Sequence, residues 1–306
     1  MYLTDSRRHY TFKPFIDLLN ASVNKDKWLL CILTHDFDSE FYQNIMKNTD
    51  IFYKIAKVQN NNNYMIKVSV ASNLAKYLNI PYIMKCDNDI LLSGHVLDYM
   101  IDNLNVLETG KFLTLGPCLS SGIPSVEYFR KSFLNADENA HLEELFKQTR
   151  FYNRDGAVYS HLNNYTLNSE KWIPSEFFTA VKESTHHYKG VHPIRFNEES
   201  IKYINECIIQ KKDRIFSKSD YSIIEDVSSP YLCDSIFCIK TERYIELIND
   251  KTLFVDDFDE VPLNKYAWKN NMGHLFVNNG NTVHINYNWN TNIQAYENEF
   301  IKRLFS

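Results

Sequence analysis

The first third of the chain alternates apolar, strand-like runs with amphipathic, helix-like runs. Short apolar runs bounded by turn residues are typical of strands buried on both faces, whereas apolar positions three or four residues apart are typical of helices. This order of elements predicts βαβ units around a mostly parallel, Rossmann-like sheet flanked by helices. The predicted strands cover 2–4, 27–34, 51–58, 81–86 and 112–115, and the predicted helices cover 11–21, 39–47, 64–78 and 94–104.

The pattern changes after Gly116 and Pro117, which end the last of these strands. A long aromatic stretch, rich in loop residues, extends to about residue 197. Around it we predict helices at 126–134, 140–148, 242–248 and 263–269, and strands at 235–239, 252–255 and 281–285. No internal repeat or low-complexity linker separates the parts. The chain therefore predicts one compact α/β unit with two halves, residues 1–116 and 117–306.

Composition narrows the classes of protein that remain. The 306 residues are 44% hydrophobic, which is enough for a substantial core, and the formal charge of -5 disfavours a nucleic-acid-binding protein. The longest apolar run, 28–33, is too short to span a bilayer, and the opening residues do not resemble a secretory signal. We expect a cytoplasmic protein. The six cysteines form no CxxC pair, so we expect reduced thiols.

The most informative polar positions are Asp87, Asn88 and Asp89, which follow the predicted strand 81–86. Ligands of open α/β sheets bind outside the carboxyl ends of strands. Two carboxylates two residues apart in a turn can converge on one cation, and oxygen ligands suit Mn²⁺ or Mg²⁺. The alternative is a solvated turn or helix cap, since Asp and Asn favour both.

The run from Lys67 to Asp89 resembles the helix, strand and DxD block of GT-A glycosyltransferases, which place an asparagine fourteen residues before the first DxD aspartate, as Asn73 stands before Asp87. The resemblance implies that Asp87 and Asp89 hold the metal, with Asp87 and Asn73 also at the donor diphosphate. It further implies that Asp36 faces the nucleotide base. Residues at the first strand would line the same pocket, namely Thr4, Asp5 and Arg7.

The chain departs from that family in two places. Ser72 stands where the nearest families often have an arginine, and the usual Pro-x-Tyr-Asn opening is replaced by Asp5-Ser6-Arg7-Arg8. Lys67 is our candidate for the missing donor-binding charge, with Lys76 and Lys85 as alternatives. Each of these lysines also fits an ordinary surface position, because a lysine stem can lie along apolar surface while its charge stays in water.

An acidic turn over 254–264 supplies the candidate catalytic group. An inverting transferase needs a carboxylate that accepts the proton of the acceptor hydroxyl, and Asp259 and Glu260 fit that role. The segment resembles the acidic motif before the last helices of inverting GT-A enzymes, but also an Asn-ending motif of some retaining families. We favour inversion and leave the stereochemistry open. The structural alternative is an N-terminal cap for the helix that follows.

His284 is the third candidate metal ligand. Many GT-A enzymes end with a histidine that completes the metal or diphosphate shell, and a neutral imidazole is a reasonable ligand. The alternative is a structural histidine in the strand 281–285.

Taken together, the resemblance implies a GT-A-type, metal-dependent glycosyltransferase. It would move a sugar from a nucleotide-diphosphate sugar, UDP-sugar favoured, to a hydroxyl of a glycan or lipid-linked glycan, in bacterial surface polysaccharide synthesis at the inner face of the membrane. Residues 1–116 would bind the nucleotide sugar, and residues 117–306 would bind the acceptor and catalyse transfer. The alternatives are a sugar-phosphate nucleotidyltransferase, which normally has a Gly-rich loop that this chain lacks before Gly94, and a non-catalytic carbohydrate-binding protein.

Overall fold

The computed structural model describes residues 1–4, 8–34, 39–58, 64–121, 125–147, 198–224, 232–253, 260–285 and 293–306. Its strands are β1 (Tyr2–Thr4), β2 (Leu30–Thr34), β3 (Tyr53–Lys57), β4 (Tyr82–Asp87), β5 (Ile90–Leu91), β6 (Phe112–Leu119), β7 (Ser222–Ile224), β8 (Ile236–Lys240) and β9 (Gly273–His284). Its helices are α1 (His9–Leu19), α2 (Ser39–Met46), α3 (Tyr64–Tyr77), α4 (Gly94–Asp102), α5 (Ser125–Phe133), α6 (Ala136–Lys147), α8 (Glu198–Gln210), α9 (Lys212–Phe216), α10 (Thr241–Asn249), α11 (Glu260–Lys269) and α12 (Ile293–Phe305).

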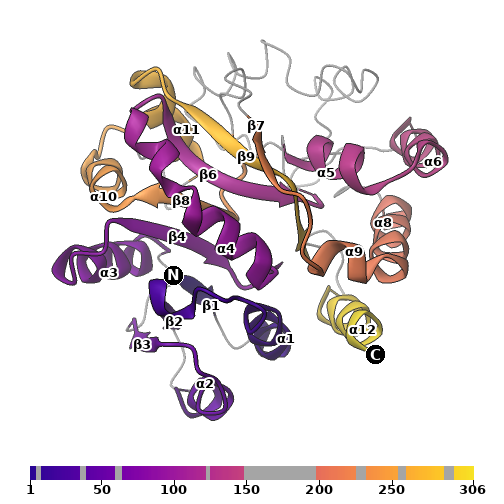
Figure 1. Cartoon of the computed structure of the whole chain (residues 1–306), viewed down its shortest axis with the longest axis horizontal. Coiled ribbons are helices and arrows are strands. Elements are labelled where there is room, and N and C mark those ends of the chain that lie inside the picture. Colours follow the sequence, from indigo (N-terminus) through magenta and orange to yellow (C-terminus); the bar gives the residue numbers. More distant parts are fainter. Residues whose placement is uncertain are drawn as a thin grey trace.

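The described strands form a mixed sheet in the order β3-β2-β1-β4-β8-β6-β9-β5, with β7 also paired to β9 (Figure 1). The strands β3, β2, β1 and β4 run parallel, as the alternation of strands and helices predicted. From β8 onward the directions are mixed, because β8 is antiparallel to both β4 and β6 while β6 and β9 are parallel. The α/β class is confirmed, but the prediction of a mostly parallel sheet is wrong for the second half.

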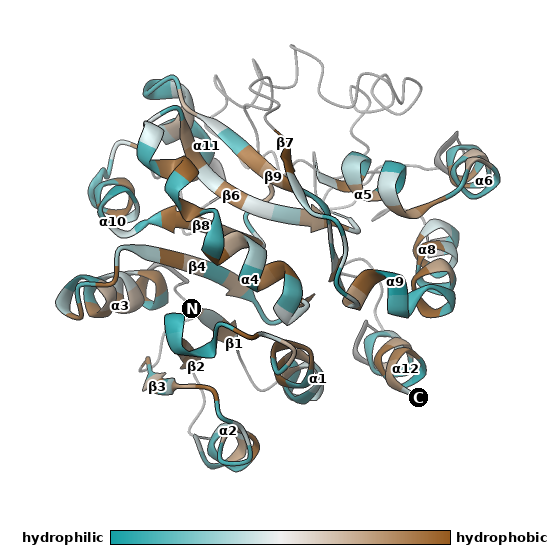
Figure 2. Cartoon of the chain, in the orientation of Figure 1, coloured by the Kyte–Doolittle hydropathy of each residue, from teal (hydrophilic) through white to brown (hydrophobic). Residues whose placement is uncertain are grey.

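Helices cover both faces of the sheet, and each face has its own apolar core. Successive strand residues point to opposite faces, so Ile32 of β2 belongs to one core and Leu33 to the other. The first core contains buried residues of α1, α4, α8 and α12, and the second contains those of α3, α10 and α11. Figure 2 shows hydrophobic residues along β8, whereas the outer helices α6 and α10 are largely hydrophilic.

The sheet must curl back on itself, because β4 and β5 are far apart in strand order and yet are joined by only Asn88 and Asp89. A chain reaches at most about 3.6 Å per residue, so the β9–β5 edge has to return to the carboxyl end of β4. This closure brings β9 to the turn formed by Asp87, Asn88 and Asp89, which we call the DND turn, and it positions the candidate site.

Several elements differ from the prediction. The strand predicted at 112–115 continues to Leu119, because a bulge between Pro117 and Cys118 lets the pairing with β9 resume. Thr252 and Leu253 lie in a turn and not in the predicted strand 252–255, whose remaining residues lie outside the described ones. The strand predicted at 281–285 begins earlier, at Gly273. Elements that the pattern did not predict are β5, β7, α8, α9 and α12.

The described residues include no helix with the length and apolar character needed to cross a bilayer. All six cysteines lie in the described part of the chain and are buried, with no disulfide between them. This agrees with the expectation of reduced thiols, and burial raises the pKa of the Cys31 and Cys238 thiols. Neither thiol offers a reactive nucleophile.

Candidate functional site

The parallel half of the sheet has a point where the strand order reverses. From β1 the chain moves outward to β2 and β3, and it then returns to place β4 on the other side of β1. Such a reversal leaves a crevice at the carboxyl ends of the two central strands, where open α/β sheets bind ligands. Here β1 ends at Thr4 and β4 ends at Asp87, with Leu3 and Asp87 directly paired. The DND turn is therefore at the position where a ligand site is expected.

Pairing of β5 with β9 brings His284 to this turn. Ile90, the residue after Asp89, pairs with His284, and the Ile285 amide donates to the Asp89 carbonyl at 2.7 Å. As a result, His284 Nε2 lies 3.6 Å from Asp89 Oδ2. Both side chains are buried. The two residues are thus close enough to share a ligand.

Three serines contact His284, two at its imidazole and one at its backbone amide. Ser121 Oγ lies 3.1 Å from Nδ1, Ser235 Oγ lies 3.3 Å from Nε2, and the Ser120 hydroxyl accepts from the His284 amide at 3.0 Å. A proton on Nδ1 would be donated to Ser121 and would leave a lone pair on Nε2, which lies near both Ser235 Oγ and Asp89 Oδ2. A hydrogen bond of this kind is how proteins usually fix the tautomer and orientation of a metal-binding histidine.

Asp87 faces a different partner. The Lys85 ammonium group, whose residue is 0% exposed, lies 3.0 Å from the Asp87 carboxylate and 3.3 Å from Asp234 Oδ2. The pKa of Asp87 is raised, first because burial disfavours its charge; Lys85 acts in the opposite direction, and Asp234 and Asp89 raise the pKa further. The Asp87 side chain still keeps 29% of its surface exposed, so a ligand can reach it.

Arg8 is the second cation at the turn. Its Nη1 lies 3.2 Å from Asp89 Oδ2, and its Nε and Nη2 donate to the two carboxylate oxygens of Glu297 at 3.0 and 2.9 Å. Burial acts to lower the pKa of Arg8, but the carboxylates of Asp89 and Glu297 outweigh it and the net shift is upward. Arg8 therefore remains charged and links the DND turn to α12.

The residues present suit a divalent cation held mainly by Asp89 and His284. Ligands of Mg²⁺ lie about 2.1 Å from the ion, so two adjacent ligand atoms are about 3 Å apart, a small step from the 3.6 Å found here. Among the described residues no three His, Cys, Asp or Glu side chains form a group that could hold a metal. Mg²⁺ sites for nucleotides commonly use only one or two protein carboxylates plus phosphate oxygens and water.

The predicted donor-binding residues are distributed unevenly around this edge. Lys67 is buried and its ammonium group donates to the Thr4 carbonyl at 2.9 Å, which puts a cation at the end of β1. The Thr4 hydroxyl lies 3.1 Å from the Tyr42 hydroxyl, inside the protein. Asn73 is exposed and lies about 9 Å farther along the axis of α3 than Lys67, away from the turn. The structure does not bring Asn73 to the other residues.

Five predicted site residues lie wholly or in part outside the described residues. Asp5, Arg7, Asp36 and Asp259 lie outside the described residues. Glu260 begins α11, but the position of its side chain is likewise outside the described part. A role for these five residues therefore stays a prediction.

Six residues of the site were not among the predicted ones: Arg8, Ser120, Ser121, Asp234, Ser235 and Glu297. Arg8 had a signal, because it belongs to the basic pair that follows the first strand. Asp234 had no such signal, because it reaches this site only through the antiparallel pairing of β8 with β4, which the sequence did not predict. Glu297 had none, because its partner Arg8 is 289 residues away in the sequence.

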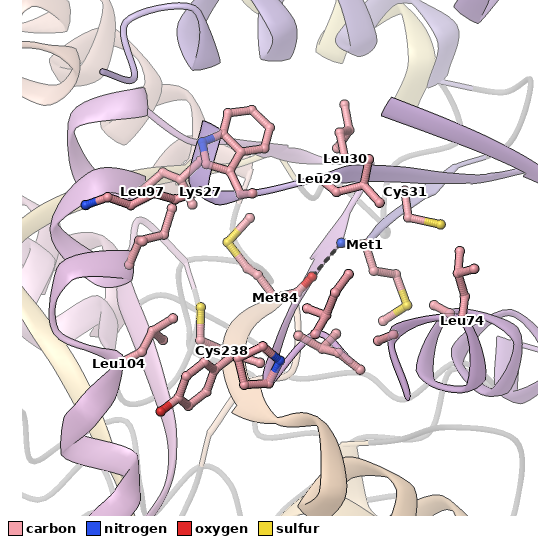
Figure 3. A pocket seen from close by; sticks show the side chains of 18 of the residues that line it. Met1, Lys27, Leu29, Leu30, Cys31, Leu74, Met84, Leu97, Leu104 and Cys238 are labelled. Atoms are coloured by element: carbon pink, nitrogen blue, oxygen red, sulfur yellow. Dashed lines mark hydrogen bonds between the residues drawn. The ribbon is translucent and has the colours of Figure 1, made fainter. Parts of the chain in front are cut away.

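An apolar cavity of about 180 Å³ is shown in Figure 3. It lies at the amino ends of the parallel strands, whereas the DND turn lies at their carboxyl ends. It is lined by residues at the amino ends of strands, including Met1, Leu30 and Tyr82, and by Leu74 of α3. The Met1 amino group donates to the Met84 carbonyl at 2.7 Å beside it. Its lining lacks the carboxylates and histidine gathered at the DND turn, so this cavity is separate from the candidate site.

The fold and the site together define an α/β protein with a carboxylate-bearing turn at the reversal point of its sheet. No protein-family model matches the sequence. No curated protein matches it either.

Proposed function

We propose that the protein is a metal-dependent glycosyltransferase of the GT-A type, which moves a sugar from a nucleotide-diphosphate sugar, UDP-sugar favoured, to an acceptor hydroxyl. The observation that carries this proposal is the meeting of Asp89 and His284 at the reversal point of the sheet. The proposed acceptor is a glycan or lipid-linked glycan of a bacterial surface polysaccharide, and the proposed place of action is the cytoplasmic face of the membrane.

The charges around the turn support a divalent cation. Carboxylates and cations gather at this turn: the side chains of Asp87, Asp89, Asp234 and Glu297 lie against those of Arg8 and Lys85. One Mn²⁺ or Mg²⁺ beside Asp89 would offset carboxylate charge that would otherwise repel a diphosphate. When bound, the metal would stabilise the negative charge that develops on the departing diphosphate.

Separate residues of the chain would then bind the sugar donor and activate the acceptor hydroxyl. Asp89 and His284 would hold the metal, and the Asp87 carboxylate would contribute a further oxygen beside it. In the favoured inverting reaction, the acceptor oxygen attacks the anomeric carbon as the bond from that carbon to the diphosphate oxygen breaks. Asp259 or Glu260 would accept the proton of the attacking hydroxyl. The products are the glycosylated acceptor and a nucleoside diphosphate.

The test is release of nucleoside diphosphate from a panel of UDP-, GDP-, CDP-, ADP- and dTDP-sugars, with and without Mn²⁺. We expect Mn²⁺-dependent release with at least one donor, and a loss of at least about 100-fold, equivalent to ~2.7 kcal/mol, in Asp89→Asn. Asp102→Asn is the matched control, because Asp102 is an exposed carboxylate paired with Lys27. It should leave release unchanged.

A thermal-shift measurement gives a second readout that does not depend on turnover. Ligands that bind only the folded state raise its melting temperature, so the best nucleoside diphosphate should stabilise the wild type more strongly with Mn²⁺ than without it. Asp89→Ala should lose the Mn²⁺-dependent part of that shift. If no donor is cleaved and no nucleoside diphosphate shifts the wild type, the glycosyltransferase assignment is wrong.

A further inference from the structure

The guanidinium group of Arg8 joins three parts of the chain that are distant in sequence. Two of its nitrogens bond both carboxylate oxygens of Glu297 in α12, and Nη1 faces Asp89 Oδ2 at 3.2 Å and Asn88 Oδ1 at 3.5 Å in the DND turn. Arg8 itself directly precedes α1. The start of α1 is fixed to the same turn, because Thr11 Oγ1 lies 2.7 Å from the Asn88 carbonyl oxygen.

Glu297 holds its carboxylate in one place. The residue is 0% exposed, and it also accepts a hydrogen bond from the Tyr10 hydroxyl. Its helix is anchored in the core by Phe300, Ile301 and Leu304. A bidentate pair between arginine and carboxylate fixes the plane of the guanidinium as well as its position. Glu297 thus holds the guanidinium group of Arg8 against the DND turn, so that Arg8 does not extend into solvent.

Arg8 retains capacity for a further ligand. A guanidinium has about five N–H donors, and the four hydrogen bonds to Glu297, Asp89 and Asn88 leave one N–H, on Nη2, without an acceptor among the described residues. The side chain is 19% exposed, so solutes can reach it. The planar donor geometry matches the oxygens of phosphate groups.

The other described cations near the turn are less suited to binding a phosphate group. Lys85 has a side chain that is only 1% exposed, and it is enclosed by Asp87 and Asp234. Lys67 is buried and bonded to the Thr4 carbonyl. Arg8 is therefore the cation at the DND turn that combines exposure with a fixed orientation.

We propose that Arg8 binds the diphosphate of the donor directly, and that Glu297 of α12 is the positioning residue that holds Arg8 beside Asp89. The inference rests on the proposed function, and it makes the last helix of the chain part of the donor site. It also assigns to Arg8 the charge that the resemblance to GT-A enzymes leaves missing.

The test compares affinities for a nucleoside diphosphate and for its nucleoside, both measured with Mn²⁺ by calorimetry. The probe is the nucleoside diphosphate that stabilises the wild type most, beginning with UDP and uridine. Arg8→Gln should weaken binding of the diphosphate about tenfold or more, because a hydrogen bond to a charged group is lost, and should leave binding of the nucleoside unchanged. A residue with only a structural role would weaken both.

Further variants separate charge from positioning. Arg8→Lys keeps the charge without the bidentate pair, and it should restore part of the affinity. Glu297→Gln should weaken diphosphate binding several-fold if positioning matters, whereas removal of a negative charge alone would strengthen it. Arg303→Gln is the matched control, because Arg303 lies in the same helix as Glu297 and forms an exposed bidentate pair with Glu206 of α8. It should behave as the wild type.

The possible outcomes are distinguishable. If Arg8→Gln fails to fold because Glu297 is left buried without its cation, the double variant Arg8→Gln with Glu297→Gln replaces it, and the same loss of diphosphate affinity is expected. An unchanged ratio of diphosphate to nucleoside affinity in the Arg8 variants overturns this inference but not the glycosyltransferase proposal. A wild type that binds no nucleoside diphosphate overturns both.

Discussion

Lys85 illustrates how a single buried residue changes the role of its neighbours. Its ammonium group lies against Asp87 and Asp234, so Asp87 already has a cation inside the protein. Asp89, two residues away, faces His284 and Arg8 instead. The two acids of the DND turn therefore have different surroundings, although the sequence pattern predicted the same role for both. This is the reason that we propose Asp89, more than Asp87, as the ligand of a metal.

The buried residue His274 leads to a prediction of how the free energy of unfolding depends on pH. It is fully buried, its Nδ1 lies 2.8 Å from Thr114 Oγ1, and burial lowers its pKa to about 3. In the unfolded chain the pKa is about 6.5, so the unfolded state takes up the proton first as the pH falls. The stability that His274 contributes is full above that value and decreases below it. From pH 7 to pH 5 this loss is about 2 kcal/mol.

Urea denaturation between pH 7 and pH 5 checks this expectation. The variant His274→Asn keeps a polar group near Thr114 but cannot take up the proton, so its stability should fall by about 2 kcal/mol less than that of the wild type over this range. Thr114→Val is the control, since it removes the hydrogen-bond partner and keeps the histidine, and it should retain the wild-type slope. Equal slopes in His274→Asn and the wild type would contradict the prediction.

At the scale of elements, the local pattern identified those whose periodicity is strong. The helices α1, α2, α3 and α4 and the strands β1 to β4 lie close to their predicted ranges. The short strands β5 and β7 were missed, because two or three residues show no periodicity. The helix α8 was also missed, although Ile201, Ile204 and Ile208 are at helical spacing. We did not predict this helix, because the loop-rich composition of the preceding stretch drew attention away from its helical spacing.

The start of α4 gives a prediction about close packing between elements. Gly94 lies so near the end of α1 that an added Cβ would be 2.2 Å from the Ser22 amide nitrogen and 2.9 Å from the Leu19 carbonyl oxygen. These are backbone atoms, which cannot turn aside as a side chain can. We expect Gly94→Ala to lower the free energy of unfolding by about 3 kcal/mol or more, measured by urea denaturation.

A second glycine serves as the control for this variant. Gly110 has a φ of +72°, but an added Cβ there meets no atom within 4 Å. Asparagine tolerates this backbone region better than other residues, so Gly110→Asn should cost about 1 kcal/mol or less. Similar losses in the two variants would show that contact with the end of α1 is not what requires Gly94.

At the scale of the whole molecule, the two predicted halves share one sheet. The strand β8, from the second half, pairs with β4 over five residues and also with β6. The core on that face combines Val68 and Ile83 from the first half with Phe237, Tyr244 and Leu263 from the second. The halves therefore depend on each other for their core, whatever their separate roles in binding prove to be.

This shared sheet predicts the behaviour of a fragment that contains residues 1–116. Without β8 and β9, the fragment would expose the edge of β4 and the apolar residues of one sheet face, so we expect no cooperative unfolding in urea and strong aggregation. Co-expression with residues 117–306 should restore folded protein. A fragment with cooperative unfolding and near-ultraviolet circular dichroism of its own would show that the first half is an independent domain.

Local patterns in the sequence were enough to predict the α/β class, the parallel order of the first strands and the place of the DND turn at the end of β4. These features depend on periodicity and turn residues that lie close together in the chain. The mixed strand directions of the second half, the contact of Asp89 with His284 and the link from Arg8 to Glu297 became visible in the folded structure alone. Those partners are far apart in sequence, and they meet because the sheet curls and α12 packs against α1, which no local pattern encodes.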